Sequence, residues 1–514
     1  MNTSTLACAI ALALLVAGCA SAPPRQSSTS LQSGLAAVSP AARLPSAADS
    51  IDLSLPLSPE RAVQVAFANN PQVRAALARL DAAYAERVQA GLVGNPMLSM
   101  MALRPEGGGR FQLEYGLMQS LYDVLTRSRR IALADADARQ RQADVLLQLV
   151  ALAQDTRQAL VQAWFAQQAL ALERALLALD EEAQVLSRRE VQRGIAAASG
   201  QLAQQSAHAR QAHETGVAES ALVQARSALA AALGLASANA ITLPAALPVP
   251  MLANHDDREW QAWAANHRPD AQLASARLEQ AQAAHRLESG AVRATLPSAG
   301  LAGMREANGM AMLGPELQVT LPVFDSGQAR TALADARVAE ATHQAEAVRR
   351  LIPLELERAL ATVLIAQDAV AQADRHLQQQ RQLQLLVERS YRRGIVDRTA
   401  QRTATRERVL AEREHLSASR TLWLQVLALE RAAGREMATD GRHATTPRLT
   451  PSANRSQPPS RAAGTRNPTG CRRFAATAPP NAARPGAGHG SPPPPRPGQG
   501  NAGCLAPSPA DAGC

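Results

Sequence analysis

An internal repeat limits the folds open to this chain of 514 residues more than any other feature does. The segment RIALADADARQ, which begins at Arg130, returns as RTALADARVAE at Arg330. The tripeptide Arg-Gly-Ile occurs at 193–195 and again at 393–395, with the same spacing of 200 positions. Several matches at one offset are typical of a duplicated structural unit. The sequence therefore predicts two copies of one unit, over residues 51–240 and 241–440.

Each copy contains a stretch that suits a very long helix. No Gly or Pro occurs between residues 126 and 193, which predicts a helix of about 100 Å at 1.5 Å per residue. The matching stretch, 328–393, is interrupted only by Pro353, where a kink is expected. Helices of this length need neighbours packed along them, as in coiled coils. Aromatic residues make up only 3% of the chain, which suits helices packed closely through Ala and Leu.

Glycines mark the ends of both long stretches. Gly194 and Gly394 are predicted to end the two helices, because glycine readily adopts the left-handed conformation of a helix C-terminus. A second helix is then expected to run back along each long one, over 201–233 and 398–433. Each copy is thus predicted to end in a helical hairpin.

Segments of alternating polarity precede the long helices. Apolar and polar residues alternate in FQLEYGLMQSL, from Phe111, and in GPELQVTLPVFD, from Gly314. This period is typical of β-strands, and about ten residues suffice to cross an outer membrane. Each segment has a candidate hairpin partner upstream, NPMLSMMAL from Asn95 and LPSAGLAGM from Leu296. Four strands per chain are therefore expected.

Four membrane strands cannot stand alone, because each unpaired backbone group at an open sheet edge is costly in hydrocarbon. A trimer would close them into a barrel of about twelve strands, an even number within the known range. The predicted fold class is thus mainly α-helical with a membrane β-barrel portion, four strands and long coiled-coil helices per chain. The alternative is that the strands are half-buried and form no membrane barrel.

The N-terminal segment has the features of an export signal. LACAIALALLVAGCA is apolar, too short to span a bilayer as a mature helix, and ends in small residues. Its VAGC resembles the lipobox of bacterial lipoproteins, which implies a signal peptide over 1–18, acylation of Cys19 with palmitate among the chains, and sorting to the outer membrane. Residues 19–50, rich in Ser, Pro and Ala, are predicted to be a flexible tether. The alternative is an ordinary signal cut elsewhere, with Cys19 discarded.

The net charge of +9 does not indicate nucleic-acid binding. Residues 441–514 hold nine Arg and a single acidic residue, so the rest of the chain is near neutral. This segment also holds fifteen of the 32 Pro and is predicted to be a disordered tail. No Cys lies between residues 20 and 470, which excludes a disulfide or a thiolate metal site there.

Three segments carry a resemblance to a known family: LSPERAVQVAFANNPQV from Leu57, LPVFDSGQARTALADA from Leu321, and YRRGIVDRTAQ from Tyr391. Together with the duplication, they resemble the TolC-like outer-membrane efflux proteins, in particular the lipoprotein branch. The resemblance implies a trimeric β-barrel continued by a helical tunnel through the periplasm. It implies a passive export duct for drugs or metal ions, without cofactor or enzymatic activity. Such a duct docks onto a periplasmic adaptor protein and an inner-membrane pump.

The same resemblance places the Arg-Gly turns at the periplasmic tip, where the tunnel opens. Tyr391, Arg393 and Arg193 are candidates for closing this aperture, and Asp397 falls near the position of the family's constricting aspartates. Ala400 stands where some members carry a second acidic residue, which implies an aspartate gate that is weaker or has a single ring. Asp397 equally suits a helix N-cap, and the two arginines equally suit helix C-termini.

Methionines gather in the predicted strand regions, which hold seven of the ten: Met97, Met100, Met101, Met118, Met304, Met310 and Met312. Thioethers favour Cu(I), so a soft-metal conduit is one interpretation. Apolar filling of the wall is the other. The His residues lack paired ligand spacing, so no metal site is predicted from them, and no catalytic motif occurs in a suitable context.

Two other functions are compatible with long helices. A periplasmic coiled-coil scaffold lipoprotein would tether the envelope and would need no membrane strands. The adaptor of an efflux pump has one helical hairpin flanked by lipoyl-like and small-barrel domains, whereas this chain has two equivalent units. We therefore expect an outer-membrane channel, with the scaffold as the alternative.

Overall fold

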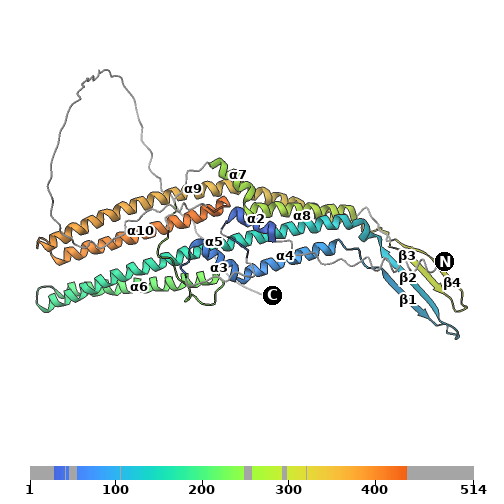
Figure 1. Ribbon diagram of the computed structural model, residues 1–514, viewed down its shortest axis with the longest axis horizontal. Coiled ribbons are helices and arrows are strands. Elements are labelled where there is room, and N and C mark those ends of the chain that lie inside the picture. Colours follow the sequence, from blue (N-terminus) through green and yellow to red (C-terminus); the bar gives the residue numbers. More distant parts are fainter. Residues whose placement is uncertain are drawn as a thin grey trace, which may run out of the picture. The chain divides into compact units, whose positions relative to one another are not determined.

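The computed structural model describes residues 28–40, 42–44, 55–104, 106–247, 250, 257–291, 298–319 and 321–436 (Figure 1). The chain divides into two compact units, 1–444 and 445–514, and all described residues belong to the first. The predicted signal peptide, Cys19 and the predicted tail from 441 lie outside the described residues. The boundaries predicted for the two copies stay predictions.

After an N-terminal helix, α2 (Ser28–Val38), six elements occur twice in the same order. The first set is α3 (Pro59–Asn69), α4 (Pro71–Ala90), β1 (Met97–Leu103), β2 (Gln112–Ser120), α5 (Leu121–Gln192) and α6 (Ala198–Ala232). The second set is α7 (Asp257–His267), α8 (Pro269–Ala291), β3 (Ser298–Arg305), β4 (Ala311–Gln318), α9 (Gln328–Arg392) and α10 (Arg398–Ala433).

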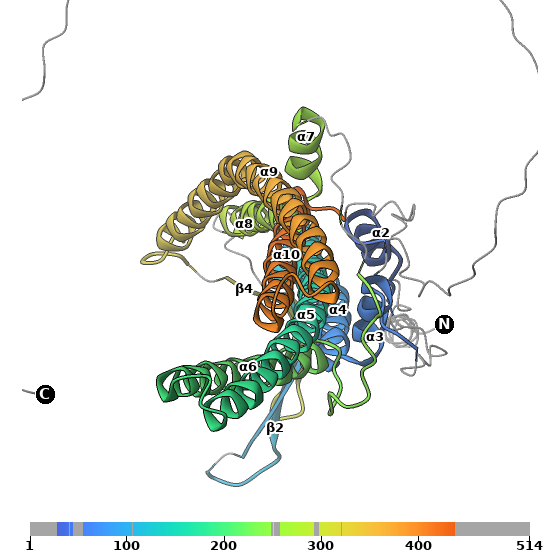
Figure 2. The same ribbon diagram turned by 90° about the vertical axis from the view of Figure 1, so that its left-hand side faces the viewer.

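The two long helices are confirmed, as are the helices that return along them. α5 has 72 residues and α9 has 65, and α9 continues through Pro353. α6 packs along α5 and α10 packs along α9, so each set ends in a helical hairpin. Figure 2 shows the hairpins α5–α6 and α9–α10 as two distinct pairs of helices. Because α5 follows directly on β2, its length separates the sheet from the hairpin tip by about 108 Å.

Short helices of each set hold the end of the returning helix of the same set. The Asn70 side chain accepts a hydrogen bond from the backbone N–H of Gln72 at 2.9 Å, which caps α4, and its Nδ2 donates to the Ala232 carbonyl at 3.0 Å. In the second set, a guanidinium N–H of Arg268 donates to the Ala432 carbonyl at 3.1 Å. Both contacts satisfy a carbonyl that the end of a helix leaves unpaired.

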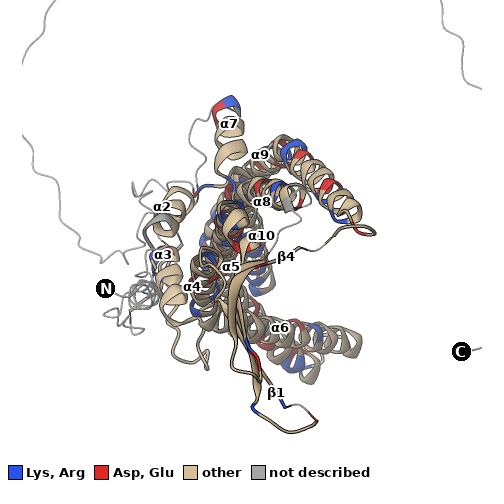
Figure 3. Cartoon of the chain, turned by 90° about the vertical axis from the view of Figure 1, so that its right-hand side faces the viewer, with Lys and Arg blue, Asp and Glu red and all other residues tan. Residues whose placement is uncertain are grey.

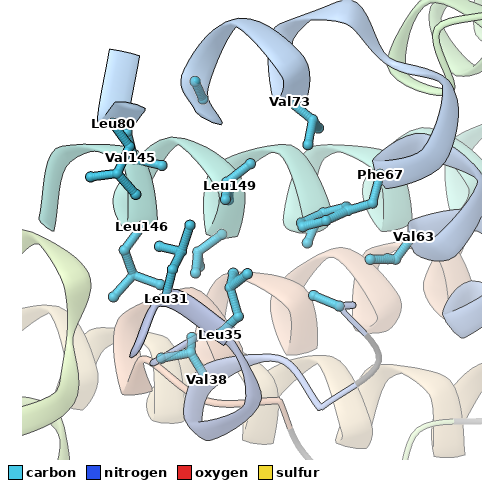
Figure 4. Packing of buried hydrophobic residues seen from close by; sticks show 14 residues of the cluster. Leu31, Leu35, Val38, Val63, Phe67, Val73, Leu80, Val145, Leu146 and Leu149 are labelled. Carbon is cyan, nitrogen blue, oxygen red and sulfur yellow. The ribbon is translucent and has the colours of Figure 1, made fainter. Parts of the chain in front are cut away.

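The N-terminal helix α2 corrects the prediction that all of 19–50 is a flexible tether. Leu31, Leu35 and Val38 are buried against Leu146 and Leu149 of α5, in a cluster that α3 and α4 complete (Figure 4). The spacing of these three residues places them on one face of a helix. Burial of that face gives the helix a tertiary partner, which a flexible tether lacks.

Contacts between α5 and α10 join the two sets of elements near the middle of the long helices. Phe165 of α5 and Trp423 of α10 share a buried apolar cluster. Beside it, the buried guanidinium of Arg157 forms two hydrogen bonds with the carboxylate of Glu430, at 2.5 and 3.2 Å. Burial alone would lower the pKa of Arg157, but the charges of Glu430 and Glu436 outweigh it and raise that pKa above its ordinary value. The guanidinium of Arg157 therefore stays charged.

The four expected strands form one antiparallel sheet in the order β1-β2-β3-β4. β2 and β3 pair over eight residues, from Leu113 with Arg305 to Ser120 with Ser298, so strands of both sets share the sheet. The fourth strand differs from its prediction, because it begins at Ala311 and ends at Gln318. The expected segment ran from Gly314 to Asp325, so the strand starts three residues earlier and ends before Leu321.

None of the described helices combines the length and apolar character that a membrane-spanning helix requires.

Replacing Arg157 by Met is expected to destabilise the protein by about 3–5 kcal/mol, because the buried carboxylate of Glu430 then loses its counter-ion. The double variant Arg157→Met/Glu430→Leu should recover much of this loss, since apolar residues often replace a buried ion pair without cost. Thermal unfolding of the detergent-solubilised protein, followed by circular dichroism, measures both effects.

The matched control is Arg174→Met, which breaks an ion pair with Glu219 of 2.8 Å whose side chains are 61% and 51% exposed. An exposed pair contributes about 0–1 kcal/mol, so this variant should unfold close to the wild type. Equal destabilisation by Arg157→Met and Arg174→Met would contradict the importance of the buried pair.

Candidate functional site

The tips of the two helical hairpins have the same backbone structure. Gly194 and Gly394 each have a φ of 71°, in the left-handed region that glycine adopts without steric cost. The backbone N–H of Ile195 donates to the Glu190 carbonyl at 2.9 Å, and that of Ile395 donates to the Ser390 carbonyl at 2.9 Å. These bonds define Schellman motifs. The repeated Arg-Gly-Ile is therefore the sequence of a helix end.

All four aperture candidates lie at these tips. Arg193 and Arg393 are the C-cap residues of α5 and α9 and are exposed, and Tyr391 is partly exposed in the last turn of α9. Within the described part of the chain, no hydrogen bond or ion pair joins the side chains of Arg193, Tyr391, Arg393 and Asp397 to one another. The fold thus brings these residues to one end of the helices without linking them.

Asp397 is the N-cap of α10. Its Oδ1 accepts a hydrogen bond from the backbone N–H of Ala400 at 2.8 Å, which satisfies one of the unpaired donors of the first turn. Ala197, the N-cap of α6, offers no such acceptor. The cap therefore distinguishes the second tip from the first.

Acidic residues of α5 meet arginines of α10 between the tip and the middle of the helices. Arg406 lies 2.5 Å from Asp180, and Arg413 lies 3.2 Å from Glu173. Gln211 of α6 donates to the Glu173 carboxylate at 2.6 Å, so one acidic side chain holds both neighbouring helices. Sequence reasoning missed these bridges. The spacing of the arginines along one face of α10 is the signal that indicates them.

The sheet has two chemically different faces, which the register defines. What we call the apolar face carries Leu98, Met100, Ala102, Leu113, Tyr115, Leu117, Ala299, Leu301, Gly303, Leu313, Pro315 and Leu317, with Gln119 and Arg305 near its two ends. What we call the polar face carries Ser99, Gln112, Glu114, Ser120, Ser298, Glu316 and Gln318 among small residues and methionines, with Leu103 at one end. Figure 3 shows charged residues to be sparse on the strands compared with the helices.

The apolar face is open to its surroundings in the single chain. Leu98 is 66% exposed, Leu313 68% and Leu317 65%. A continuous apolar surface of this kind marks a contact with a membrane or with another protein. Among the described residues, no three His, Cys, Asp or Glu converge to hold a metal ion.

Comparisons by sequence found no matching family model and no matching curated protein. Comparisons of structure found 23 matching chains. A membrane protein from Pseudomonas aeruginosa matches with a TM-score of 0.61 and 20% identity, over 76% of this chain and 98% of the other. The outer-membrane protein VceC from Vibrio cholerae matches with a TM-score of 0.58 and 16% identity, over 74% of this chain and 96% of the other. The open state of the Neisseria gonorrhoeae outer-membrane channel MtrE matches with a TM-score of 0.55 and 19% identity, over 76% of this chain and 97% of the other.

The chain therefore has the fold of TolC-like outer-membrane channels, which confirms the resemblance at the level of the fold. Nearly the whole length of each compared protein is matched.

Replacing Asp397 by Ala is expected to destabilise the start of α10 by about 1 kcal/mol, because the N–H of Ala400 loses its acceptor. Asp397→Asn should leave the stability of this turn unchanged, since the amide oxygen can accept the same hydrogen bond. Hydrogen exchange of the first turn of α10 measures the effect. Equally faster hydrogen exchange in both variants would show that the charge of Asp397, rather than its hydrogen bond, stabilises this turn.

Proposed function

We propose that this protein is the outer-membrane channel of a tripartite efflux system, a passive exit duct that performs no chemistry of its own. The observation that carries the proposal is the sheet, which combines an exposed apolar face with two unpaired edges. The likeness in fold to outer-membrane channels supports it.

The sheet edges determine how such a channel must assemble. β1 and β4 are paired on one side only, so in hydrocarbon their free N–H and C=O groups would lack partners. Pairing β4 of one copy with β1 of the next satisfies both edges. Three copies close a barrel of about twelve strands, an even number that suits membrane barrels. The protein is then a homotrimer in which each chain supplies one third of the wall.

The two faces of the sheet then acquire opposite surroundings. Leucines of the apolar face, such as Leu98, Leu301 and Leu313, contact lipid, whereas Glu114 and Glu316 on the polar face contact the water-filled lumen. The nine residues of β2 extend about 30 Å, enough to cross the apolar band of an outer membrane with some tilt. A periplasmic scaffold, the alternative, gives this exposed apolar face no role.

The long helices continue the lumen into the periplasm in this proposal. Their tips, at Arg193 and Arg393, form the aperture that docks onto a periplasmic adaptor protein and an inner-membrane pump. Tyr391 and Asp397 belong to the same aperture, and its opening lets drugs or metal ions enter. The bridge between Asp180 and Arg406 holds the two hairpins together just above it, so the hairpins open as a unit or by breaking that bridge.

The detergent-extracted protein should have the mass of a trimer in light scattering, and it should conduct ions across a planar bilayer. Asp397→Asn, which keeps the helix cap, isolates the effect of the aperture charge on that conductance. Lowered cation selectivity of the variant is expected, because a ring of carboxylates favours cations.

Assembly is tested by Leu313→Glu on the apolar face. Its matched control is Glu316→Gln on the polar face. The first places a charge in lipid and should prevent membrane assembly, and the second should leave the trimer intact. A monomer that remains soluble without detergent would overturn the channel and favour the periplasmic scaffold.

We further propose that Cys19 carries the lipid anchor, on the strength of the VAGC sequence at residues 16–19. Labelled palmitate should enter the wild-type protein and not Cys19→Ser. Assembly of the variant barrel should persist, since the strands supply their own membrane contact. Equal labelling of both proteins would contradict the anchor.

A further inference from the structure

The polar face of the sheet is rich in methionine. The register places Met97, Met101, Met118, Met304 and Met312 on this face, together with Glu114 and Glu316. On the apolar face, the paired strand residues include one methionine, Met100. Methionine that served only as apolar surface would gather on the apolar face instead. The distribution therefore calls for another explanation.

Four of these residues form one row across the sheet. Met101 pairs with Glu114, Glu114 pairs with Met304, and Met304 pairs with Met312. Side chains directly opposite on neighbouring strands have Cβ atoms about 4.5–5.5 Å apart. Methionine has three rotatable side-chain bonds, so two thioethers at this spacing can turn toward one atom.

The thioether of Met304 takes part in a polar network. Gln112 Nε2 lies 3.0 Å from Met304 Sδ and 3.1 Å from Glu114 Oε1. The sulfur and the carboxylate therefore lie close to one polar group. Met312 and Met101 are 43% and 54% exposed, so a solute can reach the row.

Small residues keep the surface beside the row open. The neighbouring row consists of Ser99, Gly116, Ala302 and Gly314. A Cβ added to Gly314 would meet nothing within 4 Å, so no side chain fills the space above it. The surface beside Met312 is therefore open, whereas the Glu316 carboxylate reaches within 3.8 Å of a Cβ added to Gly116.

We propose that Met304 and Met312, assisted by Met101 and Glu114, bind a soft monovalent cation, Cu(I) or Ag(I). Thioethers are soft ligands that select such ions, and the Glu114 carboxylate supplies a compensating negative charge. The site rests on the proposed function in one respect, since closure of the barrel turns this face toward the lumen. Binding itself needs only the sheet of one chain.

The experiment is a calorimetric titration of the full chain in detergent with silver nitrate in chloride-free buffer, after alkylation of the cysteines. Alkylation removes competing thiols, and the five Cys all lie outside the strands. The double variant Met304→Leu/Met312→Leu replaces both thioethers by apolar side chains of similar size. Met100→Leu, on the opposite face, is the matched control.

Wild type and Met100→Leu should bind silver with equal affinity. The affinity of the double variant for silver should fall about tenfold or more, since even changes outside the ligand set lower metal affinity about 10–100-fold. Zinc nitrate should give no comparable binding, because zinc prefers nitrogen, thiolate and carboxylate ligands. Equal affinity in the double variant and the wild type, or no silver binding, would overturn the site.

Light scattering on the same samples separates this result from the channel proposal. A trimer that binds no silver overturns the metal site and leaves the channel standing. Silver binding that depends on Met304 and Met312 in a protein that never forms trimers supports the site and overturns the channel.

Discussion

The ladder between β2 and β3 is the interaction on which the rest of the structure depends. Its eight residue pairs join a strand of the first set of elements to a strand of the second, so that two hairpins become one sheet. An isolated hairpin is marginally stable in water, and three or more strands with an apolar face are needed for independent stability. Because α5 continues from Ser120 without a loop, the same ladder fixes where the long helix begins.

Charged contacts between α5 and α10 align the helices further along. Arg157–Glu430 is buried, and Asp180–Arg406 and Glu173–Arg413 follow toward the tips. Long surfaces of Ala and Leu can slide past one another with little change in apolar burial. A buried charge tolerates no such shift, because it would lose its partner in a site that water does not reach. The Arg157–Glu430 pair therefore fixes the register of helices whose apolar contacts alone would specify it weakly.

Sequence patterns predicted the elements that local rules determine. The absence of Gly and Pro predicted the long helices, and alternation predicted the strands. The bridge from Asp180 to Arg406 spans 226 positions of the sequence, so the spacing of the arginines marks a charged face of α10 without identifying its partner. The helix α2 was missed because its three apolar residues, Leu31, Leu35 and Val38, stand in a segment whose composition suits a tether. The aperture role of Tyr391 and Asp397 stays a prediction, because it depends on copies of the chain that meet at the tips.

The register of the sheet links the composition of its apolar face to the chemistry of its polar face. A slip of one residue would move every side chain of a strand to the opposite face. In β1, it would move Leu98 to the polar face and Met97 and Met101 to the apolar face. The observed register gathers Leu98, Leu301 and Leu313 on one face. The same register places Met101 and Met304 opposite Glu114. In the proposed channel, the apolar residues would thereby determine which side chains face the passing solutes.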